Sequence, residues 1–142
     1  MQTQNFKNHA RFVPLYHYIG SVILVAVFIG SIINLFHSAK ENLYSASLIF
    51  ALSFVVMLAW WYLRAFALKA QDRAIRAEEN FRHFGMTGKP FDRNLRMSQI
   101  IALRFASDEE FVELAKRAVA ENLSSKQIKE AIQNWRADNH RV

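Results

Sequence analysis

The sequence of 142 residues contains no cysteine, only two prolines and only four glycines. Without cysteine the chain has no disulfide, no thiolate metal ligand and no cysteine nucleophile. The patterns G-x-x-x-x-G-K-[ST], G-x-G-x-x-G, G-x-S-x-G and H-E-x-x-H are also missing, and four glycines argue against a phosphate-cradling loop. The sequence therefore contains no motif that supports nucleotide-binding, hydrolase or metalloprotease function.

Charge is missing from two long stretches. Leu15 to Phe36 is a run of 22 residues without a formal charge, and Leu43 to Leu63 is a second run of 21. At about 1.5 Å per residue each helix reaches roughly 30 Å, the thickness of a bilayer core. The first run is too long for a signal peptide, and no good A-x-A cleavage site follows it. The sequence therefore predicts an all-α protein with a transmembrane helical hairpin, turning at His37 to Asn42.

Basic residues set the predicted orientation. Lys7 and Arg11 precede the first span, and four basic residues follow the second, whereas the turn pairs Lys40 with Glu41. Tyrosines at the start of the first span and Trp60 to Tyr62 at the end of the second mark one common interface. Because Lys and Arg accumulate on the cytoplasmic side, we expect two spans with both termini cytoplasmic.

Three regions follow from this pattern. Residues 1–14 form a cytoplasmic N-terminal segment, residues 15–68 the hairpin, and residues 69–142 a cytoplasmic helical extension with a small helical domain. The second helix has no breaker before Gly85, so it is expected to continue to that residue. A linker then leads to a middle helix near Leu95 to Phe105.

Two capping boxes predict the last helices. Ser107 with Glu110, and Ser124 with Gln127, each place a hydroxyl residue three positions before a side chain that reaches back. Apolar residues repeat at helical spacing after each box. We expect the two helices to close as an αα-hairpin whose largest core side chains are Phe111 and Trp135, with Trp135 continuing the stripe of Ile128, Ala131 and Ile132.

Polar residues inside the spans are uncharged. They are interpreted as contacts between helices, together with the small-residue pair Ala26 and Gly30. The spans contain no deep Asp, Glu, Lys or Arg, so a proton relay, an ion-coupling site and a two-helix transporter are not favoured. The polar residues concerned are Ser31, Asn34, Ser45, Ser47 and Ser53.

Positive charge is concentrated after the second span. Residues 64–104 hold nine Lys and Arg against four Asp and Glu, whereas residues 105–142 hold six against seven. This position favours contact with anionic lipid headgroups. Nucleic acid is the rival partner, because Lys126, Lys129, Gln133 and Arg136 share roughly one face of a helix. Solvation is the commoner role of such a face, so nucleic acid is the less favoured partner.

Two histidines near the first span raise a chemical alternative. His17 and His37 stand 20 residues apart, so one subunit cannot bind one haem iron with both. His9 and His17 approach only if Pro14 turns the chain back, whereas proline in the first turn is an ordinary helix start. No catalytic, cofactor or metal residue is assigned. The candidate contacts to a partner or headgroup are Asn8, His9, Arg11, His17, Arg64, Lys69, Arg73 and Arg76.

Both ends of the chain resemble those of a family. The start QNFKNHARFVPLYHY and the finish IKEAIQNWRADNHRV are similar to those of an uncharacterised family of small bacterial two-span membrane proteins, a domain of unknown function. The matching positions are Asn8, His9, Arg11, Pro14, His17, Trp135, Arg136, Asp138 and Arg141. The resemblance implies a bacterial inner-membrane location and no known activity.

Two functions from different classes remain. The favoured one is a non-enzymatic accessory, assembly or regulatory subunit, which presents its helical domain to other membrane-complex subunits or to a second copy. The alternative is a small interfacial enzyme or cofactor protein acting on a lipid headgroup or haem. In that case His9 and His17 are the acid/base or ligand candidates, and Arg11 and Arg64 bind an anion. No carboxylate lies beside these histidines in the sequence to orient a base.

Overall fold

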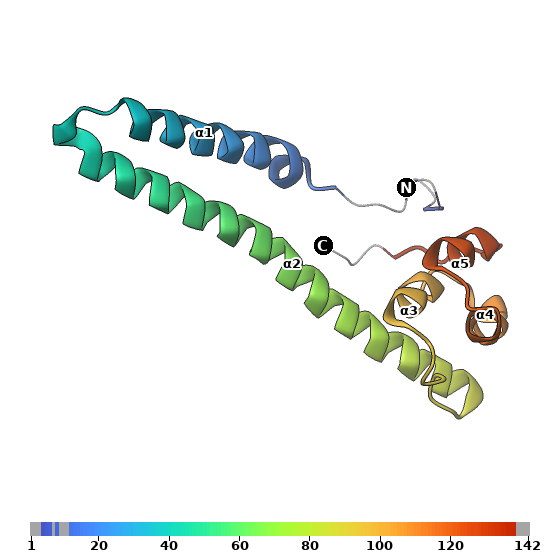
Figure 1. Cartoon of the computed structure of the whole chain (residues 1–142). Helices are drawn as coiled ribbons and strands as arrows, with labels where there is room; N and C mark the ends of the chain where they lie inside the picture. The colour runs from blue at the N-terminus through green and yellow to red at the C-terminus, as the bar shows by residue number, and fades with distance from the viewer. Residues whose placement is uncertain (1–3, 7, 9–11, 139–142) are drawn as a thin grey trace. The chain divides into compact units, whose positions relative to one another are not determined.

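The computed structural model describes residues 4–6, 8 and 12–138 and confirms the all-helical prediction. Within these residues no strand forms, and one isolated β-bridge joins Ala106 to Trp135. Figure 1 shows the helices in chain order. They are the π-helical turn η1 (Leu15–Gly20), α1 (Ser21–His37), the 3₁₀ turn η2 (Lys40–Asn42), α2 (Leu43–Thr87), α3 (Met97–Leu103), α4 (Asp108–Ala120) and α5 (Ser125–Ala131).

The chain divides into two compact units, which are described separately. The first consists of Phe12–Ala67 and is called the hairpin unit. The second joins Met1–Arg11 to Leu68–Val142 and is called the tail unit. Helix α2 contributes its first part to the hairpin unit and its second part to the tail unit.

In the hairpin unit, α1 and the first part of α2 lie side by side and are joined by the short turn at η2 (Figure 1). The buried hydroxyls of Ser31 and Ser53 are 2.9 Å apart and form a hydrogen bond between the two helices. The rings of Phe28 and Phe50 stack beside them, with centroids 5.8 Å apart. Polar contact between the helices is thus confirmed for this serine pair.

The other polar residues of the spans do not join the helices through the contacts that the structure gives them. The Ser45 hydroxyl donates to the backbone carbonyl of Asn42, just before α2, and the Ser47 hydroxyl donates to that of Tyr44 within α2. Asn34 accepts a hydrogen bond from Ser38. Ala26 and Gly30 are exposed, and a Cβ added at Gly30 would meet no atom within 4 Å. The expected small-residue contact is therefore not made among the described residues.

Aromatic stacking closes the other end of the hairpin. The rings of Tyr16 and Trp60 are parallel within 5°, with centroids 4.1 Å apart. The Tyr16 hydroxyl donates to the Trp60 carbonyl oxygen at 2.7 Å. Gly20 faces this stack, because a Cβ there would lie 2.9 Å from Trp60 Cζ2. The glycine is needed for close approach between α2 and the start of α1.

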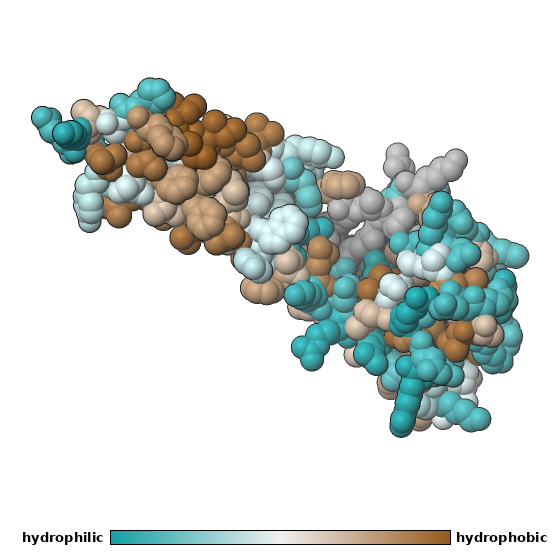
Figure 2. All heavy atoms as spheres, in the orientation of Figure 1, coloured by the Kyte–Doolittle hydropathy of each residue, from teal (hydrophilic) through white to brown (hydrophobic). Residues whose placement is uncertain are grey.

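Hydrophobic side chains cover the outside of the hairpin unit. Figure 2 shows them gathered over α1 and the first half of α2, while hydrophilic side chains cover the small helices of the tail. Only 6% of the most hydrophobic stretch of Leu15–His37 is buried, and only 11% of the corresponding stretch of Lys40–Thr87. Both helices are long and apolar enough to cross a membrane.

Helix α2 ends later than the sequence suggested. It continues through Gly85 to Thr87, and Gly88 follows with φ of +70°. The Gly88 N–H donates to the Phe84 carbonyl at 2.7 Å, as in a helix that ends on a left-handed residue. Gly88 is therefore the breaker, because only glycine adopts this conformation without a steric penalty.

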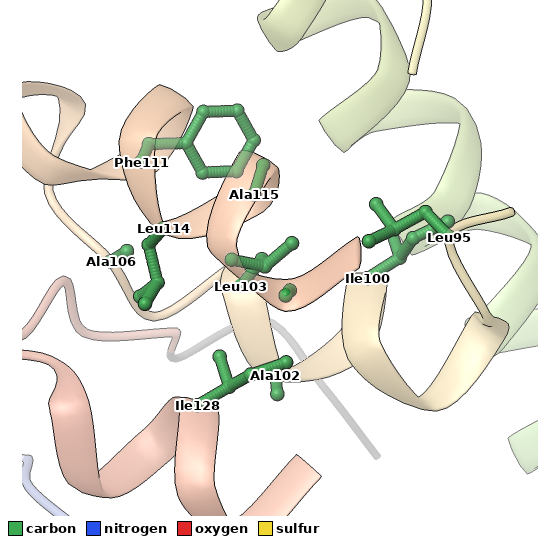
Figure 3. Close-up of a cluster of buried hydrophobic side chains, with 10 residues drawn as sticks. Leu95, Ile100, Ala102, Leu103, Ala106, Phe111, Leu114, Ala115 and Ile128 are labelled. Carbon is green, nitrogen blue, oxygen red and sulfur yellow. The ribbon is translucent and has the colours of Figure 1, made fainter. Parts of the chain in front are cut away.

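Helix α3 is the centre of the tail core. The buried cluster draws Ile100, Ala102 and Leu103 from α3, while Phe111, Leu114, Ala115 and Ala118 come from α4 and Ile128 from α5 (Figure 3). The buried Gln99 amide donates to the carbonyls of Ala118 and Leu123, both at 2.9 Å. The predicted αα-hairpin is wrong in one respect, because it built the core from the last two helices alone. Both helices pack on α3, which that prediction left out of the core.

The two predicted caps have different outcomes. At Ser124 the capping box with Gln127 is present. At Ser107 the side chain accepts no capping hydrogen bond, and its buried Oγ has no hydrogen-bond partner in the part of the chain that the structure describes. Glu110 instead accepts the N–H groups of Gln133 and Asn134, both at 3.0 Å. The prediction at Ser107 is wrong because this carboxylate serves a loop distant in sequence.

The position of Trp135 also differs from the prediction. Helix α5 ends at Ala131, and Ile132 is extended, so Trp135 does not continue a helical stripe. The segment after Ile132 instead runs beside residues 105–107, where Arg136 N–H donates to Phe105 at 2.7 Å and Ser107 N–H to Asn134 at 3.1 Å. The half-buried Trp135 therefore covers Phe105 from an extended segment.

Candidate functional site

The sequence-predicted contacts at the chain start are only partly described. His9 and Arg11 lie outside the described residues. Asn8 is exposed, and its side-chain oxygen accepts the N–H of Asn5 at 2.6 Å while its own N–H donates to the Asn5 side chain at 3.3 Å. The reciprocal bonds make Asn8 part of a short local turn.

His17 completes the start of the first helix. Its Nδ1 lies 3.0 Å from both the backbone nitrogen and the carbonyl oxygen of Val13, and the His17 N–H donates to the Val13 carbonyl at 2.8 Å. Helical conformation begins at Pro14, whose φ is −58°. The His17 ring thus contacts the backbone where the helix starts, and Pro14 has no N–H to leave open there.

The two other described histidines also contact backbone. His37 Nδ1 lies 2.9 Å from the Ile33 carbonyl oxygen, and His83 Nδ1 lies 2.8 Å from that of Lys89. The His83 ring packs against Phe91, with centroids 4.7 Å apart. Within residues 4–6, 8 and 12–138 there is no cluster of three or more His, Cys, Asp or Glu that could hold a metal ion.

The basic residues after the second apolar run divide into two groups. Lys69, Arg73 and Arg76 follow spacings of four and three residues, so they share one face of α2. Arg64 belongs to the hairpin unit, whereas the other three belong to the tail unit. The structure therefore brings three of the four predicted side chains onto one face.

A cleft with a basic rim adjoins this face. Its volume is about 520 Å³, and the arginines that line it are Arg73, Arg76 and Arg93. The buried side chains of Leu95 and Ile100 contribute an apolar floor. Arginine guanidinium groups over an apolar floor suit an amphiphilic anion, since the charge and the hydrocarbon each find a matching surface. We call this feature the basic cleft.

Arg93 is a member of the basic cleft that sequence reasoning missed. It lies in the linker between α2 and α3, and no periodicity places a linker residue beside a helix face. Phe91 sets its position, because the Phe91 N–H donates to the Asn80 side chain at 2.9 Å and its ring packs near Phe111. Asp92 is the acidic residue of the lining.

A second polar site fixes the tail to α2. Arg82 Nη1 lies 3.0 Å from the Glu79 carboxylate, Nε donates to Asp108 at 2.8 Å, and Nη2 donates to the Ala106 carbonyl at 2.8 Å. The Arg82 guanidinium also lies 4.1 Å from the ring centroid of Phe111. Glu79 is 6% exposed, so Arg82 neutralises a buried carboxylate.

The last described residues join the same site. Arg136 Nη1 lies 3.8 Å from the second oxygen of Glu79, and buried Arg104 Nε lies 3.0 Å from the Asp138 carboxylate. The Gln4 side-chain amide forms two hydrogen bonds with the Asp138 backbone. It accepts the Asp138 N–H at 2.7 Å and donates to the Asp138 carbonyl at 3.3 Å. The sequence resemblance pointed to Arg136 and Asp138, but Glu79, Arg82 and Arg104 were missed.

The predicted nucleic-acid face is not formed as a helix face. Helix α5 ends before Gln133 and Arg136, so these residues do not share it with Lys126 and Lys129. Lys126 lies 3.8 Å from Glu130, and Lys129 lies 5.7 Å from the Phe105 ring centroid. This arrangement removes the geometric reason for a helix-turn-helix reader.

Arg117 and Glu121 form an exposed ion pair on α4, with Arg117 Nε 3.1 Å from the carboxylate. The hydrogen bond raises the pKa of Arg117 and lowers the pKa of Glu121. Neither residue lines the basic cleft.

Comparison with known families gives one match over residues 1–142, to a family described as "Family of unknown function (DUF6526)". The chain belongs to the DUF6526 family. The comparisons with curated proteins and with solved structures gave no match. Membership of DUF6526 confirms the resemblance to a family of unknown function over the whole chain, and it carries no activity with it.

Proposed function

We propose that this DUF6526 protein is a non-enzymatic accessory subunit of a bacterial inner-membrane complex. In this proposal α1 and the first part of α2 form a two-span anchor with both termini cytoplasmic. The second part of α2 and the tail helices form the domain that other subunits contact. Anionic lipid headgroups meet the basic residues that follow the anchor.

The observation that carries the proposal is the outward-facing apolar surface of the hairpin unit. Phe36 is 80% exposed, Leu15 70% and Val22 69%, whereas the tail core is filled by its own side chains. At about 25 cal/mol per Å², apolar surface left in water on this scale adds nothing to the stability of the fold and favours aggregation, whereas a bilayer removes it from water. Helix α2 has 45 residues, roughly 68 Å, so it exceeds a bilayer core of about 30 Å.

The basic cleft supports the headgroup contact. Lys69, Arg73 and Arg76 follow the last apolar residues of the second run, and basic residues in that position attract anionic lipid by about 1 kcal/mol each. The apolar floor under Arg93 adds a surface for the part of a lipid next to its headgroup.

The enzyme alternative has less support. His17, His37 and His83 each place Nδ1 against backbone groups, and none of these contacts is to a carboxylate that would orient a base. Interfacial acid/base chemistry requires at least one histidine that lies next to an arginine that binds the anion. The accessory role therefore fits the described residues better.

Three measurements on the expressed chain test the proposal. The tagged full chain should remain in membranes washed with alkaline carbonate and should purify in mild detergent together with other proteins. A reporter fused after Val142 should be cytoplasmic, and one inserted at Lys40 external, because basic residues flank one side of the hairpin. Extraction by carbonate contradicts the anchor, and purification as a lone monomer contradicts the accessory role.

A further inference from the structure

The second part of α2 carries an exposed apolar stripe. Phe81 is 77% exposed and Phe84 52%, although both belong to the polar half of the chain. Exposed alanines precede them at alternating spacings of three and four residues, the repeat of a coiled-coil seam. The stripe consists of Ala70, Ala74, Ala77, Phe81 and Phe84.

The tail packs on another face of α2. Ile75, Glu79 and Arg82 are buried or nearly buried, and they lie on average about 150° around α2 from the stripe at about 100° per residue. The five stripe residues are all exposed, although Ala77 at one edge also lines the basic cleft and Ala74 lines a neighbouring cleft. Two phenylalanines on a solvent-facing helix are not explained by the packing of the tail.

Charged residues of opposite sign flank the stripe. Arg73 and Glu78 stand on its two sides and are exposed, and neither makes an ion pair with another described residue. They are five residues apart, which is the spacing that joins the two flanks of parallel coiled-coil helices. In a parallel pair, Arg73 of one copy meets Glu78 of the partner subunit, and the same pair forms a second time by symmetry.

We propose that this face is a homodimer interface, on which a second copy of the chain packs in parallel. The alanines let the two backbones approach closely, and the phenylalanines provide the main apolar contact. The stripe spans about two heptads, fewer than a free coiled coil needs, so dimerisation rests on the proposed anchor, which aligns both copies and raises their effective concentration.

The absence of cysteine makes a direct test possible. Ala70→Cys and Ala77→Cys place single thiols on the seam, and Arg76→Cys places one on an exposed position of the basic cleft, about 120° around α2 from the stripe. Mild oxidation of whole cells expressing each full chain should cross-link the first two into dimers and the third at least tenfold less. Equal cross-linking of all three, or of none, overturns the proposal. Cross-linking at one seam position alone overturns the parallel orientation.

Charge reversal tests the flanking pair. Arg73→Glu alone and Glu78→Arg alone each create two repulsive pairs, so cross-linking through Ala77→Cys should fall severalfold in both. Co-expression of the two variants restores both ion pairs and should recover the parent yield in the mixed dimer. An unchanged yield in the single variants, or no recovery in the mixture, contradicts this interface.

The readout separates the dimer from the anchor. Cross-linking is measured in whole cells, before membranes are isolated. If the dimers cross-link and carbonate extracts the protein, the result contradicts the anchor alone. Retention in washed membranes without seam cross-links contradicts the dimer alone.

Discussion

The indole ring of Trp135 stacks on the phenyl ring of Phe105, with centroids 4.6 Å apart and planes inclined by 19°. Phe105 is fully buried, and Arg104 lies 4.5 Å from its ring centroid. The two residues belong to segments far apart in the sequence, which the bridge between Ala106 and Trp135 joins. This stack ties the last described segment to α3.

Replacing Trp135 should weaken the tail without abolishing it. A fully buried tryptophan costs about 3 to 5 kcal/mol on truncation, and Trp135 is half-buried, so we expect Trp135→Ala to cost about 2 to 3 kcal/mol. Limited proteolysis of the detergent-purified chain should cut the variant tail faster. Trp135→Phe keeps most of the stack and is the control, and a tail as resistant in Trp135→Ala as in the parent would contradict this role.

Replacing Arg82 should have a larger effect. In Arg82→Ala the buried Glu79 carboxylate keeps Arg136, at 3.8 Å, as a cationic partner. Asp108 and the Ala106 carbonyl lose the hydrogen bonds that the Arg82 guanidinium donates. Loss of one partner of a buried ion pair costs about 3 to 5 kcal/mol. The same protease assay measures it, with Arg117→Ala in an exposed pair as the control.

Arg82→Lys separates charge from geometry. Lysine keeps the positive charge but cannot donate in three directions from a rigid fork, so it should recover only part of the protease resistance. Full recovery by lysine would mean that charge alone matters at this position.

Local sequence patterns predicted the long helices and one cap. The uncharged runs gave the two apolar helices because hydrophobicity is a property of a contiguous stretch, and Ser124 with Gln127 capped as expected because both partners are local. At Ser107 the same pattern was wrong, since Glu110 is drawn to the backbone of Gln133 and Asn134. Tertiary partners override a local preference where a loop presents unsatisfied N–H groups.

The candidate site was predictable only in part. Lys69, Arg73 and Arg76 stood out in the sequence because they follow the second apolar run, and Arg73 and Arg76 line the basic cleft. Arg93, Glu79 and Arg104 were missed because their roles depend on how the linker and tail pack against α2. Trp135 was placed on a helix because its spacing from Ile128 fits one, but α5 ends four residues earlier.

Gly20 is a position where a single methyl group should matter. Gly20→Ala places a Cβ against the Trp60 ring, which is held by its stack on Tyr16. Overpacking of this kind costs about 1 to 3 kcal/mol, so the hairpin should unfold at lower temperature in detergent. Gly30→Ala is the matched control, because a Cβ there meets nothing within 4 Å. Equal melting of both variants would contradict close packing at Gly20.

Anionic lipid should bind at the basic cleft. Arg76→Gln and Arg93→Gln each remove one charge from its rim while leaving the buried side chains of its floor in place. Each should weaken retention of phosphatidylglycerol by about 1 kcal/mol, roughly fivefold, as measured by native mass spectrometry of the full chain titrated in mild detergent. Arg117→Gln loses the same charge outside the cleft and should retain lipid as the parent does, and phosphatidylcholine should show no difference among the variants. Equal loss in all three variants would indicate that net charge, and not the cleft, attracts the lipid.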